Sequence, residues 1–283
     1  MRMTASIFAA ALFAALASAG AACAADKPPY DGRLFDAHVH YSANSWASFT
    51  PEAAIDLMAA EDVIGAVVSS TPDGGTRRLA AVEQSKVRIV PLYRPCRESS
   101  DLGSWFKRPD RLNATEQALM GHHRKGLGEV HIHRPANLDG ERIQNIIRTV
   151  AEAGLFIQPH ADHAVVARLF EIAPDLKIIW AHAGFSDPPD VIGRMMDKHE
   201  TLWADLSYRE IGIIESEGLN PKWEALLIRH ADRFMIGSDT WETDRWHGYA
   251  GIIDENRHWL GQLPRAVADK IAQQNAERLF GIH

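Results

Sequence analysis

Cysteine is almost absent from this sequence, which holds only Cys23 and Cys96 among 283 residues. We expect Cys23 to be lost with an N-terminal leader, so the remaining chain has no partner for an internal disulfide and its stability must come from packing. A basic excess is also absent, because 30 Lys and Arg residues face 37 Asp and Glu residues, for a formal net charge of −7. Binding to the phosphate backbone of nucleic acids normally requires a basic face, so we expect no nucleic-acid partner.

Charge is missing from the N-terminal segment as well. After Arg2, residues 3–25 hold no charged side chain and are rich in alanine, and the run ends in small residues around position 25. This pattern is typical of a secretory signal peptide, and an alanine-rich segment is weakly apolar for a stable membrane span. We therefore expect residues 1–25 to be a signal peptide, the mature chain to be periplasmic or secreted, and no membrane span to remain. A lipid anchor at Cys23 is the alternative, although the aliphatic residue expected three places before it is missing.

Strand-like and helix-like segments alternate along residues 26–283. Helical periodicity covers residues 50–60, where Thr50 can cap and Pro51 suits the first turn, and residues 141–153, which stop at Gly154. Such alternation predicts an α/β fold with a parallel sheet, and a length near 250 residues suits one (β/α)8 TIM barrel. Eight short apolar, β-branched segments supply the strands: residues 33–38, 63–70, 87–92, 127–132, 155–160, 177–182, 202–206 and 234–238.

An open doubly wound sheet is the structural alternative to the barrel. It would normally carry a glycine-rich phosphate loop after the first strand, and the DAHVH segment at residues 36–40 is not one. Two connections are long, residues 93–113 after the third strand and residues 207–221 after the seventh. Both leave the end of the barrel where active sites form, so we expect them to cover a substrate.

Histidine and aspartate stand at the ends of four of these strands. In a parallel barrel all such ends ring one mouth, so residues distant in sequence converge there, and strand alternation points the first two side chains the same way. Each histidine alone could be a buried imidazole bonded to backbone, but packing would favour apolar side chains at these positions. Together they predict a divalent metal site, with zinc as the default ion. Its members are His38, His40, His160, His182 and Asp239.

These residues lie in motifs that resemble the amidohydrolase superfamily, specifically its amidohydrolase-related branch. The motifs are DAHVH at residues 36–40, QPH at 158–160, WAHAG at 180–184, GSDT at 237–240 and NAERLFG at 275–281. The resemblance covers nearly the whole mature chain and implies a metal-dependent TIM-barrel hydrolase. It does not identify the substrate, because the superfamily includes amidases, lactonases, phosphoesterases and some decarboxylases.

The fourth strand determines how many ions the resemblance implies. Many binuclear members bridge two ions with a carboxylated lysine from this strand, but residues 126–133 read GLGEVHIH and offer none. Glu129 is a candidate for that place, as in the TatD-like hydrolases, and a structural ion pair near the barrel floor is the alternative. Two ions are expected with Glu129 as a bridge and one without it. His131 and His133 share the strand face of Glu129, so one of them could reach the pocket, but we interpret both as structural or loop residues. We expect His163 to begin a helix.

We expect the strand-end residues to share the chemistry as follows. His38, His40 and His160 bind the metal, and Asp239 binds it while relaying a proton from the attacking water to the leaving group. His182 either binds a second ion or polarises the substrate carbonyl.

Four residues that follow strand ends are candidate substrate contacts: Arg94, Arg209, Trp241 and Arg245. A guanidinium offers paired donors to a carboxylate or phosphate, so arginines in the mouth predict a small acidic substrate, such as an aromatic acid or lactone stacked on Trp241. Ordinary loop salt bridges are the alternative for each arginine.

Together these features predict a metal-dependent hydrolase that acts on a small ester, lactone or amide through a metal-activated water. The alternatives are a zinc-dependent, non-oxidative decarboxylase of an aromatic acid, a TatD-like nuclease, and a non-catalytic binding protein on the same barrel. The sequence leaves homo-oligomer formation open.

Overall fold

A computed structural model describes residues 27–121, 123–216 and 218–282 of the chain. The predicted signal peptide, Cys23 and His122 lie outside this part. Among the described helices, none combines the length and the apolar character needed to cross a membrane.

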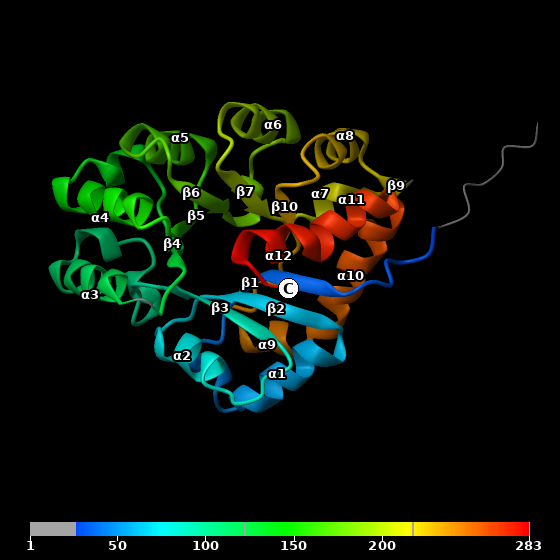
Figure 1. Cartoon of the computed structure of the whole chain (residues 1–283), viewed down its shortest axis with the longest axis horizontal. Helices are drawn as coiled ribbons and strands as arrows, with labels where there is room; N and C mark the ends of the chain where they lie inside the picture. The colour runs from blue at the N-terminus through cyan, green and yellow to red at the C-terminus, as the bar shows by residue number, and fades with distance from the viewer. Residues whose placement is uncertain (1–26, 122, 217, 283) are drawn as a thin grey trace, which may run out of the picture.

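Eight parallel strands form the centre of the fold, as the alternating sequence pattern predicts, and neighbours in the sheet follow chain order (Figure 1). The sheet is nearly closed, because Ala37 N donates to Ile236 O at 2.9 Å and Asp239 N donates to His38 O at 2.7 Å across the remaining seam. The strands are β1 (Leu34–Val39), β2 (Val63–Val68), β3 (Arg88–Tyr93), β4 (Gly126–His131), β5 (Phe156–His160), β6 (Lys177–Trp180), β7 (Leu202–Asp205) and β10 (Phe234–Met235).

Helices surround the strands as an outer ring (Figure 1). Thr50 caps the first helix as expected, since its Oγ1 accepts from Ala53 N at 3.2 Å, and Pro51 occupies the first turn. The main helices are α1 (Pro51–Ala60), α2 (Gly74–Ala80), α3 (Pro109–Met120), α4 (Glu141–Glu152), α5 (His163–Ile172), α6 (Pro189–Lys198), α8 (Pro221–Arg229) and α10 (Tyr249–Gln262). Shorter elements are α7 (Glu210–Ile213), the hairpin β8 (Ile214–Glu215) and β9 (Gly218–Leu219), α9 (Thr243–His247), α11 (Arg265–Asp269) and α12 (Asn275–Phe280).

The C-terminal helix α12 covers the end of the barrel where the strands begin. Phe280 packs against Phe35 of β1 and Phe156 of β5, with ring centroids 5.7 and 5.4 Å apart. These contacts extend the buried cluster inside the barrel and close that end. The opposite end, where the strands finish, is left for the site.

Two strands end earlier than the sequence predicts. β6 stops at Trp180 and β10 at Met235, so His182 and Asp239 lie in the loops that follow. Their backbone φ values are +56° and +47°, in the left-handed region that a strand excludes. The sequence placed both residues at the correct end of the barrel but extended the strands too far.

Candidate metal centre and active site

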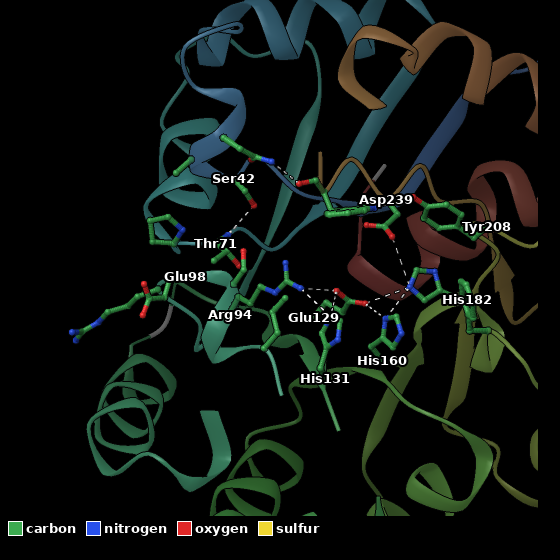
Figure 2. A pocket seen from close by; sticks show the side chains of 18 residues that line it. Ser42, Thr71, Arg94, Glu98, Glu129, His131, His160, His182, Tyr208 and Asp239 are labelled. Atoms are coloured by element: carbon green, nitrogen blue, oxygen red, sulfur yellow. Dashed lines mark hydrogen bonds and ion pairs between the residues drawn. The ribbon is translucent and has the colours of Figure 1, made fainter. Parts of the chain in front are cut away.

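A cavity of about 690 Å³ opens at the C-terminal ends of the strands. Its floor carries the predicted residues Glu129, His160, His182 and Asp239, which point toward one another from separate elements (Figure 2). The segment after β3 contributes part of the wall, including Arg97 and residues 98, 99 and 102. From the long connection after β7, Tyr208 lines the cavity.

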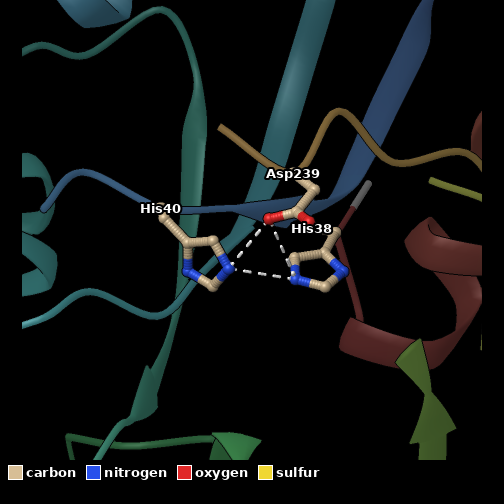
Figure 3. A group of neighbouring side chains, drawn as sticks. All are labelled: His38, His40 and Asp239. Atoms are coloured by element: carbon tan, nitrogen blue, oxygen red, sulfur yellow. Dashed lines mark hydrogen bonds and ion pairs between the residues drawn. The ribbon is translucent and has the colours of Figure 1, made fainter. Parts of the chain in front are cut away.

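The first two histidines bring their Nε2 atoms together beside one carboxylate (Figure 3). His38 Nε2 and His40 Nε2 are 3.1 Å apart, and Asp239 Oδ1 lies 3.7 Å from the first and 3.1 Å from the second. His182 Nε2 faces the same point, 3.8 Å from Asp239 Oδ2 and 3.4 Å from Glu129 Oε1. Residues from β1, β4 and the loops after β6 and β10 therefore converge as predicted.

Hydrogen bonds on the far side of each ring determine which nitrogen faces the centre with a lone pair. His38 Nδ1 donates to Asp205 Oδ2 at 3.1 Å, His40 Nδ1 donates to the Ser69 carbonyl, and His182 Nδ1 donates to the Ser207 carbonyl at 3.2 Å. Those acceptors carry no proton, so Nδ1 is the nitrogen that holds the proton in the neutral form of each ring. In that form, the one that binds a metal, three Nε2 lone pairs face the centre.

Negative charge collects at the same point. Burial alone would raise the pKa of Asp239, but attraction to His38 and His40 holds it well below its usual range. Burial likewise opposes ionisation of Glu129, yet its contacts with His131, His160 and His182 hold its pKa well below the usual value. Asp239 Oδ1 is buried and has no hydrogen-bond partner among the described residues. The Nε2 atoms of His38 and His40 therefore converge on a carboxylate oxygen that no donor satisfies, and such a cluster attracts a cation.

His160 takes a different orientation from the other three histidines. Its Nδ1 lies 2.8 Å from Glu129 Oε1 and 3.2 Å from His182 Nε2, at the edge of the cluster. The ring also stacks on His131, with centroids 4.3 Å apart. His131, which the sequence suggested was a structural or loop residue, lines the cavity, whereas His133 is exposed.

The backbone near the centre is shaped for close approach. A Cβ on Gly237 would lie 2.9 Å from His38 Cβ and 3.1 Å from Ser207 Cβ, so only glycine lets the segment after β10 pass this close to β1. The left-handed φ values at His182 and Asp239 cost about 1–2 kcal/mol each, and tertiary contacts hold them.

The four predicted substrate contacts divide into two pairs. Arg94 and Trp241 line the cavity. Arg209 does not, because Nη2 donates to Asp187 O at 2.7 Å and Nη1 donates to the Phe185 carbonyl.

Arg245 also lies outside the cavity lining. Its Nε donates to Asp239 O at 2.7 Å, and its guanidinium lies over the Tyr208 ring at 4.0 Å. Arg209 and Arg245 thus hold the backbone of the loops that carry the site, where carbonyl groups after the strand ends need donors.

Sequence reasoning missed Asp205, the last residue of β7. It is fully buried and accepts hydrogen bonds from His38 Nδ1, His182 N and Ser207 Oγ, the last at 2.6 Å. Burial would raise its pKa, but attraction to His38 keeps it below the usual value. A carboxylate at a strand end was the available signal. Two further cavity aromatics, Phe185 and Tyr208, carried no pattern that marked them.

The sequence profile of the family described as amidohydrolase matches residues 108–282, more than half of the chain. The chain belongs to the amidohydrolase family. Among curated proteins, no sequence matches this amidohydrolase.

Solved structures share the fold of this amidohydrolase at low identity. An amidohydrolase from Burkholderia multivorans with bound zinc has a TM-score of 0.57 and 14% identity, covering 89% of this chain and 100% of its own. A dihydroxybenzoic acid decarboxylase from Polaromonas sp. JS666 with bound manganese has a TM-score of 0.54 and 12% identity, covering 89% and 98%. A 5-carboxyvanillate decarboxylase from Sphingomonas paucimobilis has a TM-score of 0.52 and 14% identity, covering 81% and 82%. The same fold thus occurs in both amidohydrolases and decarboxylases.

Proposed function

We propose that this protein is a metal-dependent hydrolase that acts on a small ester, lactone or amide. The observation that carries the proposal is the convergence of His38 Nε2, His40 Nε2 and the unpartnered Asp239 Oδ1, with separations of 3.1, 3.7 and 3.1 Å. Tetrahedral ligands bound at about 2.1 Å lie about 3.4 Å from one another. The residues therefore fit a divalent ion, and His182 and Glu129 complete the candidate ligand set.

A divalent ion bound at this point supplies Lewis acidity, which lowers the pKa of water from 15.7 to about 7. The side chains supply the remaining functions. Asp239 presents two carboxylate oxygens, Oδ1 toward His38 and His40 and Oδ2 toward His182, so one can accept a proton while the other faces the ion. His182 presents a lone pair, which suits a ligand or a proton acceptor better than a neutral donor to a carbonyl.

The cavity wall suggests what kind of substrate is bound. Arg94 and Arg97 line it from the segment after β3, and the exposed Arg97 carries positive charge that an acidic group could contact. Phe185, Tyr208 and Trp241 line it from the loops after β6, β7 and β10, and Trp241 and Phe185 are 48% and 55% exposed. A flat, acidic small molecule matches these walls.

A decarboxylase of an aromatic acid is the second candidate, and the aromatic wall is the observation that favours it. Release of CO2 from an aromatic acid would identify this reaction directly.

The test is an activity screen of the metal-reconstituted protein with lactones, amides, phosphoesters and aromatic acids. We expect hydrolysis of one ester, lactone or amide class and a loss of about 10²–10⁴-fold in Asp239→Asn. Asp175→Asn is the matched control, because Asp175 is exposed before β6, at the opposite end of the barrel. Metal-independent hydrolysis, or full activity in Asp239→Asn, would contradict the proposal.

A further inference from the structure

A second group of candidate metal ligands lies beside the first. Glu129, His131 and His160 place their ligand atoms within 4.8 Å of one another. Glu129 Oε1 is 2.8 Å from His160 Nδ1, and Oε2 is 3.4 Å from His131 Nε2. By residue type alone, this group suits a second divalent ion that shares Glu129 with the first.

Arg94 fills the position that this second ion would need. It follows β3 directly and is 5% exposed, so its guanidinium is buried within the cluster rather than in solvent. Nη2 donates to Glu129 Oε2 at 2.8 Å and to His131 Nε2 at 3.3 Å. Figure 2 shows Arg94, Glu129 and His131 in this arrangement. Two of the three residues in the second group therefore direct ligand atoms at an arginine.

The chemistry of arginine means that Arg94 excludes a metal ion from this position. A guanidinium in a protein stays charged and has no lone pair, so it contributes positive charge but cannot bind a metal. The lone pair of His131 that would bind an ion accepts a hydrogen bond from Nη2 instead. A divalent ion in the same place would be repelled by the positive charge of Arg94, and Glu129 Oε2 and His131 Nε2 already accept hydrogen bonds from Arg94.

The hydrogen bonds to Glu129 and His131 are the contacts that position the guanidinium of Arg94. Its Nε is buried and has no hydrogen-bond partner among the described residues, and Nη1 lies 3.3 Å from His40 Nδ1. Glu129 thus lies between two positive charges. One is the ion proposed between His38, His40 and Asp239, and the other is Arg94.

We infer that Arg94 takes the place of a second metal ion, so that this centre binds one ion and Glu129 is paired with arginine instead of bridging two metals. The inference rests on the proposed metal centre but not on the reaction it performs. Arg94 is in this sense a positioning residue for Glu129.

The test counts metal ions in the purified protein and in two variants. Each protein is stripped with a chelator, reloaded with excess Mn²⁺, desalted, and measured for manganese per chain by mass spectrometry and for spin coupling by electron paramagnetic resonance. We expect one ion with an uncoupled spectrum in the wild type, and two ions with an exchange-coupled spectrum in Arg94→Met. The matched control is Arg97→Met, which removes a cavity arginine three residues away and should keep one ion.

The manganese counts distinguish an error in the one-ion inference from an error in the metal centre itself. Two ions in the wild type, or one ion in a folded Arg94→Met variant, would overturn the inference. If Arg94→Met does not fold, as judged by circular dichroism, Arg94→Gln gives the same comparison with a polar side chain, and the wild-type count still applies. A wild type that binds no manganese would instead overturn the metal centre itself.

Discussion

Replacing Asp205 with asparagine is expected to weaken metal binding by disturbing two histidines at once. Asp205 Oδ2 accepts from His38 Nδ1 at 3.1 Å and from Gln158 Nε2 at 3.2 Å, while Oδ1 accepts from His182 N and from the Ser207 hydroxyl. Asparagine keeps one acceptor and turns the other position into a donor. Whichever way its amide is placed, at least one of these pairs becomes donor against donor.

The expected loss of metal affinity follows from a change in the tautomer of His38. If the amide nitrogen faces its ring, His38 loses the acceptor that keeps its proton on Nδ1, and the proton moves to the Nε2 that faces the metal. Loss of such a partner typically costs 10- to 100-fold in metal affinity, or about 1.4–2.8 kcal/mol. A buried donor left unsatisfied costs about 1–3 kcal/mol of folding stability in addition.

The assay is competition for zinc against a chromophoric chelator, with urea unfolding of the metal-free protein measured separately. Asp101→Asn is the matched control, because Asp101 is equally buried but pairs with Arg111 and Arg108 instead of a histidine. It should lower stability without the loss in zinc affinity. Wild-type zinc affinity in a folded Asp205→Asn variant would refute the reasoning.

Three further predictions concern the scaffold. Burial raises the pKa of Cys96 to about 11 from 9.0, so the thiol of the folded protein should resist iodoacetamide at pH 8, as measured by intact mass. The contribution of this thiol to stability should be complete below pH 9.0 and be lost as the pH rises toward 11. Rapid alkylation of the folded protein would contradict this prediction. Gly237→Ala should lower the free energy of unfolding in urea by about 1–3 kcal/mol and should also weaken zinc binding, because its Cβ would lie 2.9 Å from His38 Cβ. Unchanged stability and zinc affinity would contradict the claim that the backbone at Gly237 must lie this close to His38. Asn275→Ala should cost about 1–3 kcal/mol for each carbonyl it leaves unsatisfied, since Nδ2 donates to Ala231 O and Phe234 O at 2.8 Å, and a wild-type urea midpoint would contradict this.

The sequence predicted the barrel because its signals are local. Each strand is a short apolar segment between helical ones, and Thr50 with Pro51 marks a helix start that the structure confirms. The convergence of His38, His182 and Asp239 followed from a rule of topology, since all strand ends of a parallel barrel meet at one mouth.

What the sequence did not predict depends on three-dimensional contacts. Arg209 and Arg245 occupy loop positions that look like substrate contacts, yet both are held by backbone carbonyls, Arg209 by Asp187 O 22 positions away and Arg245 by Asp239 O six positions before it. Asp205 gained its importance from the ring of His38 and the backbone N–H of His182, 167 and 23 positions away. The pairing of Glu129 with Arg94 spans 35 positions and has no periodic signal.

The most direct test of the metal centre is the anomalous difference map of a crystal soaked with zinc. We predict a peak bonded to His38 Nε2, His40 Nε2 and Asp239 Oδ1 at about 2.1 Å. No peak at these atoms after a soak that loads zinc elsewhere in the crystal would contradict the central claim that they form a metal site.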